Sequence, residues 1–308
     1  MGEKKELIDA KVIKREFINK MLIFGTLVLT VIVAASIAGI WVAERYNEKL
    51  LEEYFSQMEE VPEENEEENG KAEEIQEVQE ETTIPANPVY SEDAKYRMDK
   101  IYKEGNVEKI AYLTFDDGPS SNITPQILQI LKDEGIRATF FVLGSRVELY
   151  PELVKQEYEA GHYIANHGYS HEYKSVYSSP NAVLDEYNHT ETLIRQAIGN
   201  DGYSSHLFRF PGGSTGKYLD VKKEAIKLLE ENNIAYINWN ALTNDAVGHP
   251  TAESIVNDLK STASGKNKIV VLMHDTGSKQ LTADTLPEII SYLRDEGYEF
   301  KNFYDIMY

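Results

Sequence analysis

From about residue 101 onward, the sequence alternates short apolar runs with segments of helical periodicity. The apolar runs lie at 110–115, 138–143, 163–166, 207–210, 235–239 and 269–273, with a weaker one at 298–303. Helical stretches with typical start and stop residues occur between most of them, at 124–135, 151–161, 183–199, 217–233, 252–259 and 286–297. About seven such units predict a parallel sheet covered by helices, as an open doubly wound sheet or as a barrel.

The positions of the polar side chains favour the barrel. The candidates for chemistry, each at or shortly after the carboxyl end of a predicted strand, are Asp116, Asp117, His167, Arg209, Asp245 and His274. A barrel gathers these ends around one axis, whereas an open sheet spreads them along a line. We therefore expect an α/β fold of the distorted (β/α) barrel type, and an incomplete one because eight full units are not visible.

Composition excludes several classes of protein. The chain has 308 residues, which is enough for one domain of about 200 residues beside a long non-globular part. It contains no cysteine, so disulfides, thiolate catalysis and cysteine-ligated zinc are excluded. The net charge of −21 argues against nucleic-acid binding, because a nucleic-acid-binding protein presents a basic face to the phosphates.

Residues 21–43 contain no charged side chain. A helix of this length would extend about 35 Å and could cross the hydrocarbon core of a bilayer. The apolar region of a signal peptide is shorter, at about 7–15 residues, although cleavage near Ala34 or Ala38 stays open. Because residues 1–20 are basic, we expect a cytoplasmic tail, an uncleaved transmembrane helix at 21–43, and the rest of the chain outside the cytoplasm.

Residues 44–98 are predicted to be an acidic, largely disordered stalk. Glutamates crowd the stretch 63–81, where they are interrupted mainly by Asn, Gly and Gln. So few apolar side chains cannot offset the entropy lost on ordering, and the like charges repel one another. The stalk would act as a spacer or as a plain linker, and the folded catalytic domain is expected at 99–308.

Two motifs contain the groups that a hydrolytic metal site needs. They are Thr-Phe-Asp-Asp-Gly-Pro at 114–119 and His-x-x-x-His at 167–171. One carboxylate can bind a divalent cation, its neighbour can accept a proton from water, and two neutral imidazoles can complete the coordination. Taken singly, each motif is more often a solvated turn or a pair of surface histidines. Their agreement with His274 at a further strand end favours the metal site, and His162 is expected to be structural.

Residues from about 108 to 308 resemble the polysaccharide deacetylase (NodB homology) domain of carbohydrate esterase family 4. The matching segments are TFDDGP at 114–119, H-x-x-x-H at 167–171, R-x-P at 209–211, Asp245 after the strand that contains Trp239, and Leu-Met-His at 272–274. The resemblance implies a distorted barrel of about seven units. It also implies removal of N- or O-acetyl groups from sugar polymers with a divalent metal, expected to be zinc, with cobalt, manganese, nickel or iron as alternatives.

Matched position by position, the resemblance implies roles for the candidate residues. The metal ligands would be Asp117, His167 and His171. Asp116 would be the general base and His274 the acid that protonates the leaving amine.

Four further positions would support these groups. Arg209 would pair with Asp116 and keep it ionised, because a neighbouring cation lowers the pKa of a carboxyl group. Asp245 would raise the pKa of His274. The backbone N–H of Gly212 would stabilise the oxyanion, and Leu272 would line a pocket for the acetyl methyl group. Asp275 is left outside the predicted site.

Two positions depart from the family pattern. The third motif usually reads Arg-x-Pro-Tyr, but Gly212 follows Pro211 here. The fourth usually ends in Asp-Trp, but Ala246 follows Asp245. Two aromatic side chains that would contact the sugar are therefore missing.

The sequence predicts a membrane-anchored, extracytoplasmic, metal-dependent N-deacetylase of a cell-wall glycan. N-acetylglucosamine of peptidoglycan is the expected substrate, on the basis of location and family. An O-acetyl or other glycan deacetylase with the same site is one alternative. A non-catalytic wall-binding protein that retains the fold is the other.

Overall fold

The computed structural model describes residues 87–103 and 107–307. The predicted cytoplasmic tail, the predicted membrane helix and most of the predicted stalk lie outside these residues. Among the helices of the described part, none has the length and apolar character needed to cross a bilayer.

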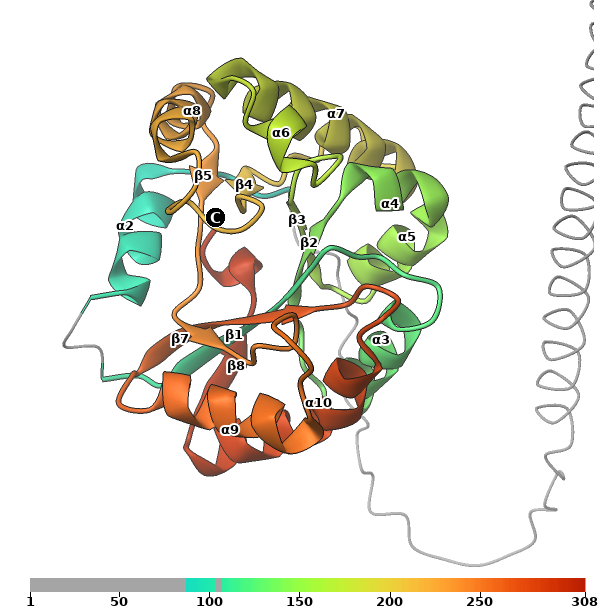
Figure 1. Cartoon of the computed structure of the whole chain (residues 1–308), viewed down its shortest axis with the longest axis vertical. Helices are drawn as coiled ribbons and strands as arrows, with labels where there is room; N and C mark the ends of the chain where they lie inside the picture. Colours follow the sequence, from blue (N-terminus) through green and yellow to red (C-terminus); the bar gives the residue numbers. More distant parts are fainter. Residues whose placement is uncertain (1–86, 104–106, 308) are drawn as a thin grey trace, which may run out of the picture. The chain divides into compact units, whose positions relative to one another are not determined.

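A parallel sheet forms the centre of the described domain (Figure 1). Its strands are β1 (Ile110–Asp116), β2 (Thr139–Val142), β3 (Tyr163–Asn166), β4 (Leu207–Phe208), β5 (Ala235–Tyr236), β6 (Ala241–Leu242), β7 (Lys268–His274) and β8 (Glu299–Lys301). They follow the order β5-β4-β3-β2-β1-β7-β6, with β8 beside β1. Within the described residues β5 and β6 are the two open ends of this order, so the sheet is a half-barrel. The expected parallel, incomplete barrel is confirmed in this form.

Strands β8 and β2 pair with the same edge of β1, each along a different part of it. Along its other edge, β1 pairs with β7 over the full length of both strands. On the β8 side, Ile110 to Tyr112 pair with β8, whereas Thr114 to Asp116 pair with β2. The carboxyl end of β1 therefore lies between β2 and β7.

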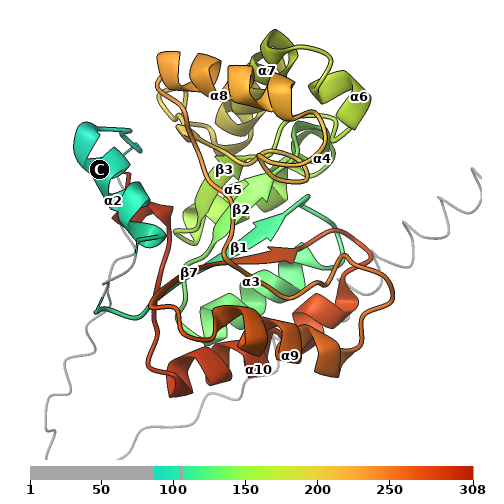
Figure 2. The ribbon, with the colours of Figure 1, turned by 60° about the vertical axis from the view of Figure 1, so that its left-hand side comes forward.

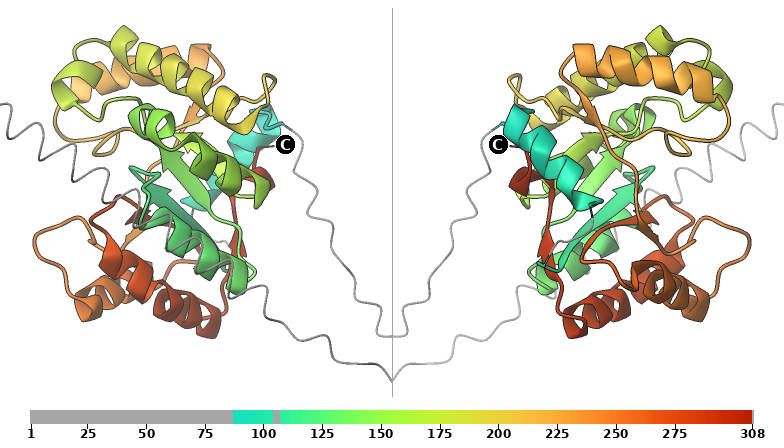
Figure 3. Two further views of the ribbon diagram at one scale, coloured as in Figure 1. Left: turned by 90° about the vertical axis from the view of Figure 1, so that its right-hand side faces the viewer. Right: turned by 90° about the vertical axis from the view of Figure 1, so that its left-hand side faces the viewer.

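Most of the helices cover the outer face of the sheet, with α7 and α8 together on one side and α9 and α10 together on another (Figure 2). The helices are α2 (Glu92–Ile101), α3 (Thr124–Asp133), α4 (Gly144–Leu149), α5 (Pro151–Glu159), α6 (Tyr173–Val176), α7 (Pro180–Ile198), α8 (Leu219–Glu231), α9 (Ala252–Ala263), α10 (Gln280–Asp295) and the 3-10 turn η1 (Phe303–Asp305). Helix α2 lies beside the carboxyl-terminal turn (Figure 3).

The structure differs from the sequence predictions at three places. Helix α2 begins inside the segment predicted as stalk, and Ala94 and Met98 of this helix are buried, so the folded part begins before residue 99. Strand β6 was not predicted, because Ala241 and Leu242 lie between Asn240 and Thr243 and belong to no longer apolar run. Helix α10 begins at Gln280 and contains Pro287, whereas the sequence predicted a helix that starts at 286.

Side-chain alternation along β1 points the first reactive group inward. Residues Ala111 and Phe115 are buried between the sheet and the helices. Ile110 and Tyr112 belong instead to a core inside the half-barrel. Because successive side chains of a strand point to opposite faces, Asp116 points into the same interior.

Strand β7 brings the second reactive group beside the first. Val270 lies in the interior core, whereas Ile269 and Val271 lie under the helices. By the same alternation His274 points inward. It is also the register partner of Asp116 across the β1–β7 pair.

Candidate active site

A cavity of about 420 Å³ opens at the carboxyl ends of the strands. It is lined by Asp116, Asp117, His167, His171, Tyr173, Gly212, Trp239, Leu242, Asn244, Asp245, Ala246, Val247, Leu272 and His274. Every site residue predicted from the sequence lines this cavity except Arg209, which is fully buried and bonded to Asp116. The structure thus brings together groups from strands that are far apart in the chain.

Asp117, His167 and His171 place three potential ligand atoms within 4.8 Å of one another. The Oδ1 atom of Asp117 lies 3.4 Å from Nε2 of His167 and 3.5 Å from Nε2 of His171. Bonds of about 2.1 Å in a tetrahedral zinc site separate neighbouring ligand atoms by about 3.4 Å. The spacing of these residues therefore fits a divalent metal ion.

The hydrogen bonding of this triad also fits a metal. Oδ1 of Asp117 is buried and has no hydrogen-bond partner among the described residues. Nδ1 of His167 lies 2.7 Å from the carbonyl oxygen of Arg209. Since a carbonyl only accepts, Nδ1 carries the hydrogen and the lone pair of Nε2 is free for a metal. Burial lowers the pKa of His167 to about 3, so its imidazole is neutral.

Two of the three potential ligands have a backbone conformation that is unfavourable for a residue with a side chain. The φ angle is 73° at Asp117 and 56° at His171. Such left-handed residues cost about 1–3 kcal/mol each and persist where the surrounding structure holds them. The turn at Asp117 directs adjacent carboxylates to different positions, so that Asp116 remains free to act as a base.

Asp116 forms a buried ion pair with Arg209. Nη1 of Arg209 donates to Oδ1 of Asp116 at 2.7 Å and to the hydroxyl of Thr114 at 2.7 Å. The guanidinium is packed against Phe141, with its carbon 3.8 Å from the ring centroid. Oδ2 of Asp116 lies 3.7 Å from Nε2 of His167, so the base borders the metal triad.

The expected pairing of Arg209 with Asp116 is present, but it does not produce a net lowering of the pKa of Asp116. Burial is the larger effect and raises the pKa of Asp116, while the Arg209 guanidinium opposes this rise. Because the side chain is almost completely inaccessible to solvent, the loss of hydration outweighs the ion pair. The result is a carboxylate that is more basic than an ordinary aspartate.

His274 and Asp245 form the second acid–base pair. Nδ1 of His274 is 2.8 Å from Oδ1 of Asp245, while Oδ2 accepts from the backbone N–H of His274 and from the hydroxyl of Thr282. Burial disfavours the protonated imidazole, but the hydrogen bond and charge of Asp245 outweigh it and raise the pKa of His274 to about 9. The pKa of Asp245 is lowered despite its burial, because these donors stabilise the carboxylate.

Gly212 and Leu272 both line the cavity, the first from the turn after β4 and the second from β7. Gly212 follows β4 and has a φ of 70°, a conformation in which glycine is not strained. Its N–H makes no backbone hydrogen bond within the described residues. Leu272 points inward from β7, beside the acid His274.

Sequence reasoning missed the groups that hold the loop between the two histidines. Glu186 of α7 accepts hydrogen bonds from the backbone N–H groups of Tyr169 and Ser170 and from the hydroxyl of Ser170. Asn166 accepts from the N–H of Gly168. No local sequence pattern marks Glu186, because it lies 17 residues along the chain from Tyr169, with which it bonds.

Asp275 also lies close to the site. Its side chain is completely buried, packs against Gly118, and accepts a hydrogen bond from Thr124 at 2.5 Å. Burial raises the pKa of Asp275 to about 7. The backbone carbonyl accepts from the Ser120 hydroxyl. Asp275 therefore stabilises the turn that follows Asp117 through its contacts with Gly118, Ser120 and Thr124.

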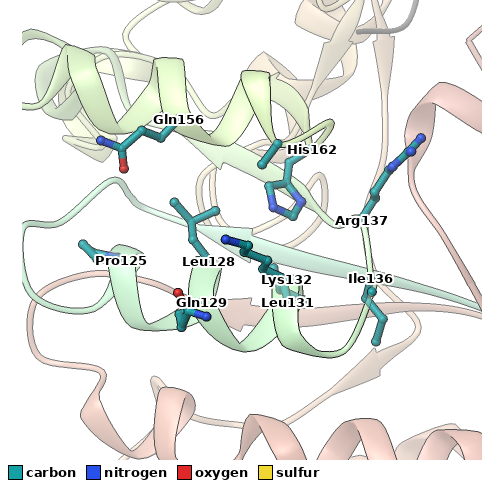
Figure 4. A pocket seen from close by; sticks show the side chains of 11 residues that line it. Pro125, Leu128, Gln129, Leu131, Lys132, Ile136, Arg137, Gln156 and His162 are labelled. Atoms are coloured by element: carbon teal, nitrogen blue, oxygen red, sulfur yellow. The ribbon is translucent and has the colours of Figure 1, made fainter. Parts of the chain in front are cut away.

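A second cavity, of about 700 Å³, lies between α3 and α5. Figure 4 shows His162 and Gln156 on one side of it, facing Leu128 and Lys132 on the other. Nδ1 of His162 accepts the N–H of Ala138, which is the structural role expected from the sequence. This cavity shares no lining residue with the first and contains no acid–base pair, so it is not the candidate active site.

The half-barrel with a potential metal triad beside a carboxylate base and an imidazole acid defines the class of protein as an acid–base hydrolase. A family model described as "Polysaccharide deacetylase" matches residues 103–236. A peptidoglycan-N-acetylglucosamine deacetylase of Bacillus cereus is 32% identical over 225 residues, covering 70% of this chain and 78% of the relative. The chain belongs to the polysaccharide deacetylase family, carbohydrate esterase family 4, whose deacetylases are metal-dependent hydrolases that act on carbon–nitrogen bonds.

Solved structures agree with this assignment. A family 4 esterase of Streptococcus mutans is 29% identical, with a TM-score of 0.60 over 70% of this chain and 92% of that one. A pseudoenzyme of the same family from Bacillus anthracis, 24% identical, has a TM-score of 0.56 over 66% of this chain and 67% of that one. The second similarity shows the fold alone.

Proposed function

We propose that this chain removes N-acetyl groups from a cell-wall glycan, with N-acetylglucosamine of peptidoglycan as the substrate. The observation that carries the proposal is one cavity that contains a potential metal triad, the base Asp116 and the acid His274. The name of the Bacillus cereus relative supports the choice of sugar.

The proposed cofactor is a divalent metal held by Asp117, His167 and His171. Zinc fits the ligand set of two nitrogens and one oxygen, and cobalt, manganese, nickel or iron would accept the same donors. When bound, the metal would polarise the acetyl carbonyl and acidify the attacking water.

Asp116 would accept the proton of that water. Its raised pKa brings the carboxylate closer to the working pH, at which a general base is most effective. Arg209 fixes its orientation through Nη1 and leaves Oδ2 on the side of His167.

His274 would protonate the nitrogen of the leaving sugar amine. Asp245 holds Nδ1, so the proton on Nε2 is the one available to the substrate. A pKa of about 9 keeps this imidazole protonated at neutral pH. Gly212 would donate its N–H to the oxygen that becomes negative, and Leu272 would contact the acetyl methyl group.

The location is part of the proposal. The uncharged segment 21–43 and the basic segment before it support a single-pass membrane anchor with a cytoplasmic amino terminus. The acidic segment between residue 44 and helix α2, most of the predicted stalk 44–98, would then separate the catalytic domain from the membrane.

Acetate release tests the activity. The full chain with added Zn²⁺ should release acetate from a chitin oligomer or from peptidoglycan fragments. Asp116→Asn should abolish the release and retain zinc binding, whereas Asp201→Asn, at an exposed position outside the cavity, should change neither. Mass analysis of the product would identify the sugar. Release of O-linked acetate alone would favour the ester substrate, and zinc binding without any release would favour the non-catalytic alternative.

A further inference from the structure

Tyr173 lies directly over Gly212 on one wall of the active-site cavity. A β-carbon built on Gly212 would lie 2.6 Å from the hydroxyl oxygen of Tyr173 and 3.1 Å from the ring carbon that carries it. Both residues line the cavity together with Asp117 and His171. The Tyr173 hydroxyl can therefore occupy its position beside residue 212 only because this residue has no side chain.

The position of Tyr173 is fixed from two sides. It is the first residue of α6, and the centroid of its ring lies 5.4 Å from that of His171 and 5.9 Å from that of Tyr177. The hydroxyl of Tyr177 donates to the carbonyl of Pro211 at 2.7 Å. Tyr177 thus connects the ring of Tyr173 with the backbone that carries Gly212.

The Tyr173 hydroxyl and the Gly212 N–H are two hydrogen-bond donors on this wall of the cavity. Neither the hydroxyl of Tyr173 nor the N–H of Gly212 makes a hydrogen bond within the described part of the chain. The neighbouring tyrosines differ, since Tyr169 donates to Glu148 and Tyr177 to Pro211. Tyr173 is 38% exposed and lines the cavity.

Two free donors side by side, next to a potential metal triad, form an arrangement that can bind a negatively charged oxygen. Donors of this kind lower the barrier of acyl transfer because they are already oriented where charge develops. We propose that the Tyr173 hydroxyl and the Gly212 N–H together stabilise the oxyanion, an inference that rests on the proposed deacetylase function.

Hydrolysis of the acetyl group proceeds by addition of water and loss of the amine. Attack by water forms a carbon–oxygen bond and moves the electron pair of the carbonyl bond onto its oxygen, while Asp116 accepts a proton. The two donors stabilise that oxygen. When the electron pair returns, the carbon–nitrogen bond breaks and the nitrogen takes a proton from His274.

The test replaces only the hydroxyl, in the full chain loaded with Zn²⁺. Tyr173→Phe should lower kcat for acetate release from a chitin oligomer by about 10²-fold, which is typical for loss of one oxyanion donor. It should leave KM and zinc affinity close to the wild-type values. Binding of methylphosphonate, a tetrahedral anion with one methyl group, should weaken by about tenfold when measured by calorimetry, because the same donor would face its charged oxygens.

Tyr169→Phe is the matched control, because Tyr169 lies in the loop directly before α6 and directs its hydroxyl to the exposed Glu148. This variant should retain kcat, zinc affinity and methylphosphonate affinity. Equal kcat and equal methylphosphonate binding in Tyr173→Phe and the wild type would overturn the inference. A raised KM as the only change would also overturn it, since Tyr173 would then contact the sugar.

The two proposals fail in different ways. Weaker methylphosphonate binding in Tyr173→Phe, with no acetate released by the wild type from any acetylated glycan, would retain the oxyanion site and reject the deacetylase. Acetate release by the wild type with no effect of Tyr173→Phe would retain the deacetylase and reject this role of Tyr173.

Discussion

Asp245 accepts two hydrogen bonds from the single residue His274. Its Oδ2 atom receives the backbone N–H at 2.8 Å and its Oδ1 atom lies 2.8 Å from Nδ1 of the ring. The carboxylate therefore holds both the position of β7 and the orientation of the imidazole. Thr282, from the first turn of α10, donates to the same carboxylate and fixes it in turn.

Asp245→Asn should lower kcat and move the alkaline limb of the pH profile to lower pH. The neutral amide removes the charge that raises the pKa of His274, while burial, which lowers that pKa, remains. The alkaline limb of kcat against pH measures the change in the enzyme–substrate complex. An alkaline limb at the same pH in the variant would show that Asp245 does not set the pKa of the acid.

The wild-type enzyme should have a bell-shaped pH profile with one acidic and one alkaline limb. His274 must be protonated, so activity should fall as the pH rises through about 9. Asp116 must be ionised, and because burial raises its pKa, the acidic limb should lie above the ordinary range of aspartate. Measurement of kcat/KM between acid and alkaline pH, with the fold checked by circular dichroism, tests both limbs. A limb that lies at the ordinary aspartate pKa would contradict the effect of burial.

Removal of the metal should abolish activity and lower the melting temperature. A ligand that binds only the folded state stabilises it by about 2.7 kcal/mol at a concentration 100 times its Kd. Zinc should therefore raise the Tm of the wild type, and a chelator should reverse the rise. Asp117→Asn should lose most of the zinc effect. An equal rise in Tm for this variant and the wild type would place the metal elsewhere.

Much of the site was predictable from the sequence because its groups follow strands. Asp116 and His274 end the two longest strands, whose apolar runs are easy to recognise, and parallel pairing then makes them neighbours. The balance of forces at Asp116 was not predictable, because the extent of burial depends on how the barrel packs around it. The same holds for Tyr173 over Gly212, since no local spacing shows that two loops will touch.

Glu186→Ala should weaken zinc binding by about 10–100-fold, the range found for residues that orient metal ligands. The carboxylate accepts three hydrogen bonds from Tyr169 and Ser170, which lie between the histidines of the triad. Without it, the loop that connects His167 and His171 loses all three of these hydrogen bonds. Calorimetry of zinc binding measures the effect. Glu148→Ala, which removes only a contact with the Tyr169 hydroxyl, should bind zinc like the wild type.

Arg209→Met should destabilise the fold and also impair the base. Removal of one member of a buried ion pair costs about 3–5 kcal/mol, because the other charge stays buried without its partner. Here Asp116 would lose both a cation and a hydrogen-bond donor, and its pKa would rise further, so the acidic limb of the pH profile should move to higher pH.

The double variant separates these two effects of Arg209. Adding Asp116→Asn to Arg209→Met removes the unpaired charge, so part of the lost stability should return in urea unfolding while activity stays absent. If the double variant is as unstable as the sum of the two single variants, the packing of Arg209 on Phe141 matters more than its charge. In that case the guanidinium stabilises the fold chiefly as a buried planar side chain.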